Sequence, residues 1–143
     1  MTTLTVIKTT EVEDYVLQLA DRLEAQYKEY HVRSMTKFTS DWANKQLESV
    51  KNGTANLMRF NVIKGRKYWK IFAYEYDDRA EEYKQGSINC FVDRETGDVF
   101  KPASYNKPAK HVRYNLLERS SRAECLLRAD WAGGYLYLRW LIY

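Results

Sequence analysis

The sequence has few of the residues that divide a chain into separate parts or cross-link it. Only two prolines and six glycines occur among 143 residues, so there is no flexible linker that would separate two domains. Cys90 and Cys125 lie far apart in the sequence, and without an export signal we expect reduced, buried thiols rather than a disulfide. The length suits a domain that buries a core without covalent support, so we expect a single domain over residues 1–143.

Long apolar runs are also missing. The longest is YLYLRWLIY at residues 135–143, which contains Arg139, whereas a helix needs about 20 apolar residues to cross a bilayer. The first residues, MTTLTVIKTTEVEDY, lack the basic start, apolar segment and cleavage site of a secretory signal. We therefore expect no contact with a membrane and a location in the cytoplasm.

The sequence carries none of the common catalytic motifs. It has no Walker phosphate loop, GxGxxG, HExxH, CxxC or GxSxG, so the enzyme classes that are readable from sequence have no support. Only His31 and His111 accompany the two isolated cysteines, which is a poor ligand set for zinc. His111 could act as a general acid or base, but we favour an ordinary basic segment because no carboxylate lies at a telling spacing. We expect no enzyme, no metal and no cofactor.

Positive charge is concentrated at the C-terminal end. The net charge is +4, yet residues 101–143 contain eight Lys and Arg against three Asp and Glu. A local positive field of this kind favours an anionic partner, such as a nucleotide, a nucleic acid or an acidic protein surface.

Helical periodicity dominates the first third of the chain. Thr10 and Glu13 resemble a capping box, and the apolar spacing that follows predicts a helix over residues 11–30 with one buried stripe, formed by Val12, Val16, Leu19, Leu23, Tyr27 and Tyr30. A second helix is predicted over residues 33–51, with Asn52 and Gly53 as its stop signal. Residues 31–34 could break the first helix or continue it.

The pattern then changes to the alternation that is typical of strands. Residues 57–76 predict a hairpin, residues 77–86 a loop and residues 87–101 a second hairpin with a turn at RETG. Residues 101–110 hold both prolines and predict an ordered loop. A helix follows over residues 109–130, in one or two pieces because Ser121 and Glu124 form another capping box, and the last nine residues predict a strand. This order predicts an α+β domain: two N-terminal helices, an antiparallel sheet of two hairpins plus a C-terminal strand, and a short helix before that strand.

Aromatic residues are abundant and several alternate with cations. On one face of the first hairpin, Tyr68, Lys70, Phe72 and Tyr74 could stack bases while cations hold phosphates. The same alternation also suits simple packing, because aromatic residues favour strands and fill cores, and we favour packing.

The segment KPASYNKPAKHVRYN at residues 101–115 is the best candidate for a binding site. It combines cations, two amides and an aromatic pair in a proline-stiffened loop, and it leads into the predicted helix. Because helix-start amides point outward and carry partial positive charge, this arrangement predicts an anion pocket. A solvated basic loop is the plain alternative.

The run CFVDRETGDVFKPASYNKPAKHVRYNLL resembles a group of small, uncharacterised bacteriophage proteins with a KPASxxxPAKxxRxN signature, and ADWAGGYLYLR is similar to their C-terminal strand. At the position of Tyr105 we expect Trp more often in that group, so this chain keeps an aromatic ring there. The resemblance covers roughly residues 87–139. It implies a phage protein that acts in the cytoplasm of the host.

More distantly, the chain is similar to phage anti-Thoeris sponges, which sequester nucleotide signals without cleaving them. This resemblance implies a non-enzymatic protein that captures an anionic nucleotide-type small molecule, either a cyclic ADP-ribose isomer or a cyclic oligonucleotide, to counter host defence. It assigns a ring and an amide to Tyr105 and Asn115. Lys110 adds a nearby cation, and the candidate phosphate clamps are Arg113, Arg139 and Arg33.

Three other functions remain open. The basic segment could bind nucleic acid in phage replication or transcription, or it could dock on a host protein and inhibit it; a minor virion component is a further alternative. The terminal YLYLRWLIY and the large rings favour self-association, so we expect a homo-oligomer, a dimer or higher.

Overall fold

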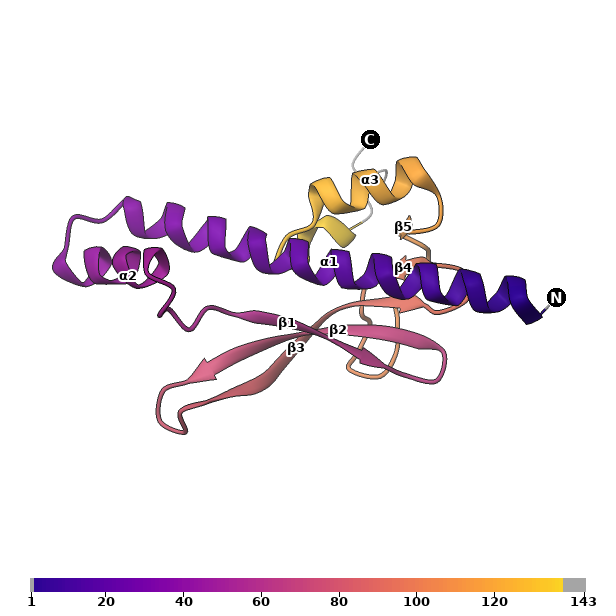
Figure 1. The fold of residues 1–143 in the computed structure, drawn as a ribbon, viewed down its shortest axis with the longest axis horizontal. Coiled ribbons are helices and arrows are strands. Elements are labelled where there is room, and N and C mark those ends of the chain that lie inside the picture. The colour runs from indigo at the N-terminus through magenta and orange to yellow at the C-terminus, as the bar shows by residue number, and fades with distance from the viewer. Residues whose placement is uncertain (1, 138–143) are drawn as a thin grey trace.

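The computed structural model describes residues 2–137 and confirms the α+β fold. Two N-terminal helices precede an antiparallel sheet, and a third helix follows it (Figure 1). The elements are α1 (Thr2–Thr36), α2 (Asp41–Lys51), β1 (Arg59–Lys64), β2 (Tyr68–Asp77), β3 (Glu82–Asp93), β4 (Asp98–Phe100), β5 (Tyr114–Asn115) and α3 (Arg119–Arg128). The strands are ordered β1-β2-β3-β4-β5 in the sheet.

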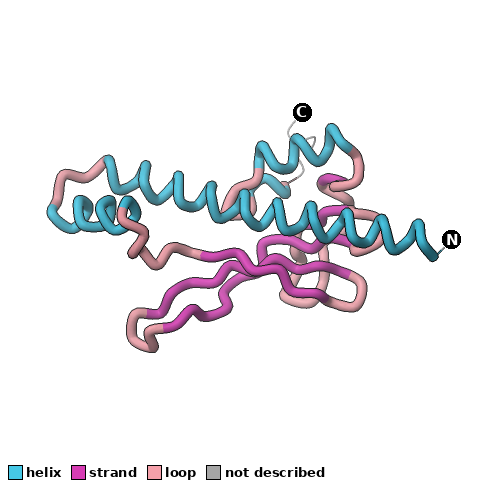
Figure 2. Tube along the Cα trace, viewed as in Figure 1, coloured by secondary structure: helices cyan, strands magenta, loops and turns pink. Residues whose placement is uncertain are grey.

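The helices lie on one side of the sheet, so the molecule has two layers (Figure 2). The core fills the space between these layers. It includes Leu19 and Leu23 from α1, Ile71 and Val92 from the sheet, and Cys125 from α3. No helix of the described part covers the opposite face of the sheet. That face is therefore the open side of the fold.

The predicted apolar stripe of α1 is confirmed in its first four members. Val12, Val16, Leu19 and Leu23 are fully buried, because spacings of four and three residues place them on one side of a helix. Tyr27 is half-buried, and Tyr30 is 43% exposed, with its ring 5.1 Å from the Trp131 ring, centroid to centroid.

The limits of both N-terminal helices differ from the prediction. The first helix runs from Thr2 to Thr36 rather than over residues 11–30, so Thr10 lies inside it and is not its cap. Neither glycine nor proline interrupts residues 2–36, which lets the helix continue at little cost. The second helix therefore begins only at Asp41, where the Ser40 hydroxyl accepts a hydrogen bond from the Ala43 amide.

The two hairpins are confirmed. Strand β1 pairs with β2, and β3 pairs with both β2 and β4. The turn between β3 and β4 requires Gly97, whose φ is +77° and whose added Cβ would meet the Leu117 side chain at 3.1 Å. The predicted loop over residues 77–86 is too long, because β3 already begins at Glu82. The first charged side chains of β3, Glu82 and Lys84, are exposed at the end of the β2–β3 hairpin.

The prediction of a helix over residues 109–130 is wrong in its first half. Residues 109–118 form no helix and contain the short strand β5, which pairs with β4. Helix α3 begins at Arg119, and its cap is Glu118 rather than Ser121. The Glu118 carboxylate accepts hydrogen bonds from the amides of Ser120 and Ser121, which satisfies donors that a helix start leaves unpaired.

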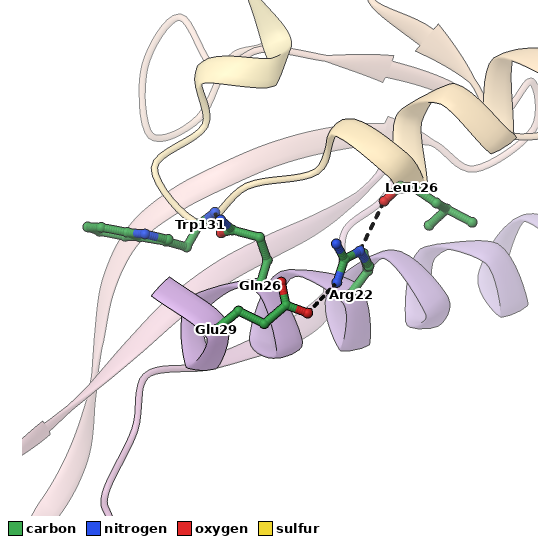
Figure 3. A network of polar contacts seen from close by, with 5 residues as sticks. All are labelled: Arg22, Gln26, Glu29, Leu126 and Trp131. Atoms are coloured by element: carbon green, nitrogen blue, oxygen red, sulfur yellow. Dashed lines mark hydrogen bonds and ion pairs between the residues drawn. The ribbon is translucent and has the colours of Figure 1, made fainter. Parts of the chain in front are cut away.

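Polar contacts attach the end of α3 and the segment after it to α1 (Figure 3). Arg22 Nε donates to the Leu126 carbonyl at 3.2 Å and pairs with Glu29 at 3.5 Å. Gln26 Oε1 accepts a 2.8 Å bond from the Trp131 amide. The bonds to Leu126 and Trp131 join residues more than a hundred positions apart and attach the C-terminal region to α1.

The predicted C-terminal strand does not begin at Tyr135. Gly134–Leu136 forms a short 3₁₀ helix after Gly133 in the left-handed region, and this turn buries Tyr135 and Leu136. The remainder of that strand prediction, residues 138–143, lies outside the described residues. Among the helices of residues 2–137, none has the length and apolar character that a membrane span requires.

Candidate functional site

The ordered loop predicted over residues 101–110 is present, extends to residue 113 and folds back on itself. Pro102 and Pro108 form an isolated antiparallel bridge, and the amides of Ala103 and Ser104 both donate to the Lys107 carbonyl. The Arg113 amide donates to the Val99 carbonyl, which returns the chain to the sheet. However, no helix begins at Pro108, so the outward-pointing helix amides of the predicted anion pocket are missing from this loop.

Tyr105 lies at the tip of this loop and contacts the open face of the sheet. Its ring is 5.2 Å from the ring of Phe72, centroid to centroid, and 51% of the residue is exposed. Gln85 Nε2 donates a 2.7 Å hydrogen bond to the Tyr105 hydroxyl, and the Tyr74 hydroxyl donates to Gln85 Oε1. These bonds hold the Tyr105 ring in one orientation, with its outer face accessible.

Arg113 is used inside the protein. Its Nε donates to the Leu136 carbonyl, and its Nη1 donates to the carbonyls of Lys110 and His111. Burial lowers the pKa of the Arg113 guanidinium. Because two of its nitrogens already hold backbone carbonyls, Arg113 links the loop to the C-terminal turn.

Asn115 is likewise a structural residue. Its Nδ2 donates to the Thr96 carbonyl and to Asp98 Oδ1, and its Oδ1 accepts from the amides of Leu117 and Glu118. The amide group therefore has both a donor and an acceptor role within the fold. These bonds connect the β3–β4 turn to the start of α3.

The structure describes two of the other three predicted residues. Lys110 is exposed, and Arg33 lies in the last turn of α1, at the end of the molecule where α2 begins (Figure 1). Arg139 lies outside the described residues. The structure thus leaves Tyr105 as the member of the predicted set whose ring meets the open face.

The open face carries two groups of rings, one around Tyr68 and one around Phe72. Since Trp69 and Ile71 point into the core, their alternate neighbours on β2 point away from it. We use the name ring surface for the residues that gather there: Tyr68, Lys70, Phe72, Tyr74, Phe91, Phe100 and Tyr105. The Tyr68 ring meets Phe91 and Phe100 edge-on, with centroid distances of 5.6 and 6.1 Å.

Sequence reasoning identified only part of this surface. The alternation on β2 indicated Tyr68, Lys70, Phe72 and Tyr74, for which we favoured plain packing. Phe72 and Phe91 are indeed buried under their neighbours, whereas Tyr68, Tyr74 and Phe100 remain partly accessible. Phe91 and Phe100 belong to the ring surface because the sheet pairs β3 with β2 and β4 with β3. In the sequence, the alternation of SINCFVD already separates Phe91 from the buried Cys90.

Two lysines accompany these rings. Lys67 Nζ lies 5.4 Å from the centroid of Tyr68, and Lys70 Nζ lies 5.6 Å from the centroid of Phe91. These are the distances of cation–π contacts. Asp93 lies opposite Tyr68 on the neighbouring strand β3. Its Oδ1 accepts hydrogen bonds from the amides of Glu95 and Thr96.

A separate small hollow of about 160 Å³ lies between the sheet and the C-terminal turn. Lys101, Trp131 and Tyr137 line it together with Ser87 and Asn89. Lys101 Nζ is 5.0 Å from the centroid of the Tyr137 ring. The hollow has room for one ring, with a cation at its wall.

Groups suited to metal or thiol chemistry do not gather in the described part of the chain. No three His, Cys, Asp or Glu side chains are placed there to hold a metal ion. Both cysteines are free and buried, and burial raises the pKa of Cys90 to about 12. Neither thiol is therefore a ready nucleophile at neutral pH.

Comparison with known proteins identifies a family but no activity. A family model described as a family of unknown function (DUF7717) matches residues 3–138, so the chain belongs to this family. No curated protein and no solved structure matches the chain significantly.

Proposed function

We propose that this protein is a non-enzymatic binding protein whose ligand is single-stranded nucleic acid, held on the ring surface. The observation that carries the proposal is the open sheet face where Lys67 and Lys70 lie over aromatic rings. Single-strand binders combine rings that stack on bases with cations that follow the phosphates.

The partly exposed rings are the ones that would meet bases. Tyr105 has an accessible outer face and is held by Gln85 and Phe72. Its orientation is set before binding, so less entropy is lost when a base stacks on it. Tyr68 offers a second ring on which a base could stack, near Lys67. An open face suits a polymer, because the strand can enter at one end of the surface and leave at the other.

Binding to labelled oligothymidylate, followed by fluorescence anisotropy, tests this proposal. Tyr68→Ala and Tyr105→Ala should each weaken binding by about 1–3 kcal/mol, the usual value of one stacked base. Trp42→Ala is the matched control, because that ring is 59% exposed on α2, away from the ring surface. Absence of binding at low salt would reject the proposal, as would equal losses in Trp42→Ala.

A second candidate is capture of a small nucleotide-type signal, such as a cyclic ADP-ribose isomer or a cyclic oligonucleotide, as a phage defence against host immunity. The hollow between Lys101, Trp131 and Tyr137 favours it, since a ring and an anion could both be satisfied there. Native mass spectrometry of protein from cells with such a signalling system would detect a bound molecule. A small pocket would also show a shallow dependence on salt, whereas a polymer shows a steep one.

Self-association is part of the proposal. Phe38, between α1 and α2, is 58% exposed, and Leu127 on α3 is 78% exposed. Large apolar side chains in such positions often meet another chain. Light scattering should show a dimer or a larger assembly at micromolar concentration, and a monomer would contradict this expectation.

A further inference from the structure

The turns β1–β2 and β3–β4 lie together at one end of the sheet and bring three cations to one place. Arg94 follows β3, and its amide donates to the Lys67 carbonyl at 3.0 Å. Its Nη1 donates to the carbonyls of Gly65 and Arg66. We use the name turn cluster for Arg66, Lys67 and Arg94, which line a hollow of about 360 Å³.

No ion pair in the described chain neutralises these three cations. Asp93 and Glu95 also line the hollow. Asp93 Oδ1 accepts from two backbone amides, and Glu95 is an exposed residue. The undescribed residues 1 and 138–143 contain no Asp or Glu, so no further acidic side chain can come from them.

Arg94 is built into the site and retains an unused donor. Its guanidinium is fixed by the two turn carbonyls and lies 5.7 Å from the centroid of the Trp69 ring. Its Nε is buried and has no hydrogen-bond partner. A buried donor without a partner carries a free-energy cost, which an acceptor oxygen that reaches Nε would remove.

We propose that the turn cluster is a phosphate-binding site. The identity of its ligand rests on the proposed function: the phosphate belongs to the backbone of the single strand whose bases stack on the ring surface. Lys67 connects the two surfaces, because it lines the hollow and its Nζ also lies 5.4 Å from the Tyr68 centroid. Arginine supplies the planar, charged donor set that phosphate oxygens accept.

Two probes separate this site from the function as a whole. Sodium pyrophosphate, followed by NMR of the arginine Nε–Hε groups, should shift the Arg94 signal in a saturable way. Oligothymidylate binding, measured over a range of salt, counts phosphate contacts directly, with a slope of about 0.7 per contact on logarithmic axes.

The test variant is Arg66→Ala with Lys67→Ala, which leaves Arg94 and its bonds in place. Its control is Lys37→Ala with Lys45→Ala, which removes the same charge from exposed positions at the α2 end of the molecule. The test variant should bind pyrophosphate about tenfold more weakly and should lower the salt slope for oligothymidylate by about 0.7 for each lost contact. The control variant should change neither.

Each result decides a different statement. If pyrophosphate shifts no Arg94 signal, or if the test variant retains both affinity and salt slope, the turn cluster is not a phosphate site. If the test variant retains both, oligothymidylate could still bind through the ring surface, and the proposed function would stand. If pyrophosphate binds but oligothymidylate does not, the phosphate site stands and single-strand binding is rejected.

Discussion

The hydroxyl of Tyr135 donates a buried hydrogen bond of 2.7 Å to Oδ1 of Asn89. This bond joins the C-terminal turn to the middle of β3, across 46 positions of sequence. Burial raises the pKa of Tyr135 well above its usual value, so the hydroxyl keeps its proton and remains a donor at neutral pH.

Tyr135→Phe should therefore destabilise the fold. The substitution leaves Asn89 Oδ1 buried without this donor, which costs about 1–3 kcal/mol in the free energy of unfolding. Urea unfolding followed by circular dichroism measures the loss. Tyr137→Phe is the control, because that residue is 62% exposed. Equal stability of the two variants would contradict the role assigned to the bond.

Asn115→Ala should lower stability without affecting the ligand. It removes the side-chain bonds to the Thr96 carbonyl and Asp98 and those from two amides before α3, for an expected loss of about 2 kcal/mol. Asn106→Ala, in the exposed loop, should have little effect. A folded Asn115→Ala protein that no longer binds oligothymidylate or nucleotides would return Asn115 to the ligand-binding role that the resemblance to phage sponges implied.

The cysteines should react only after unfolding. Burial raises the pKa of Cys90 to about 12 and raises that of Cys125 as well, so at neutral pH both are thiols shielded from solvent. A colorimetric disulfide reagent at pH 8 should label neither in the native protein and both in denaturant. Rapid labelling of the native protein would show that this part of the core opens.

Helix α3 should lose stabilisation in acid through Glu118. Hydrogen bonds from the Ser120 hydroxyl and from the amides of Ser121 and Ser120 lower the Glu118 pKa from its ordinary value of 4.5. Since the folded pKa is the lower one, the contribution is complete above 4.5 and disappears as the pH falls through the folded value.

Glu118→Gln should remove this part of the acid dependence. Unfolding measured between about pH 6 and pH 2 compares the variant with the wild type, and an NMR titration gives the carboxyl pKa directly. Glu11→Gln, at an exposed position of α1, provides the comparison. A Glu118 pKa at or above 4.5 would mean that the cap is not formed in solution.

The parts of the fold that were predictable depend on local periodicity. The spacing of Val12, Val16, Leu19 and Leu23 identified one buried helical side, and alternation identified both hairpins. The limits were less accurate, because propensity alone does not stop a helix. The first helix continues to Thr36, and α2 begins only after its cap, Ser40.

Errors in the candidate site have a different origin. A helix over residues 109–130 was predicted from Leu116, Leu117 and the apolar residues at 123–127. In the structure the amides before α3 find other partners: the Arg113 amide donates to the Val99 carbonyl and the Leu116 amide to the Gly97 carbonyl. Arg113 and Asn115 look like ligand residues in a basic segment, yet both bind backbone groups that only the folded chain brings near them.

The sequence by itself determined the α+β class, the two N-terminal helices, the hairpins and the ordered proline loop, because each follows from contacts or steric limits within a few residues. Only the tertiary structure decided which cations and rings are accessible. The pairing of β2 with β3 and β4 assembles the ring surface, and two turns far apart in sequence make the turn cluster around Arg94. A side chain's partners depend on which distant segments pack against it, and local pattern does not carry that information.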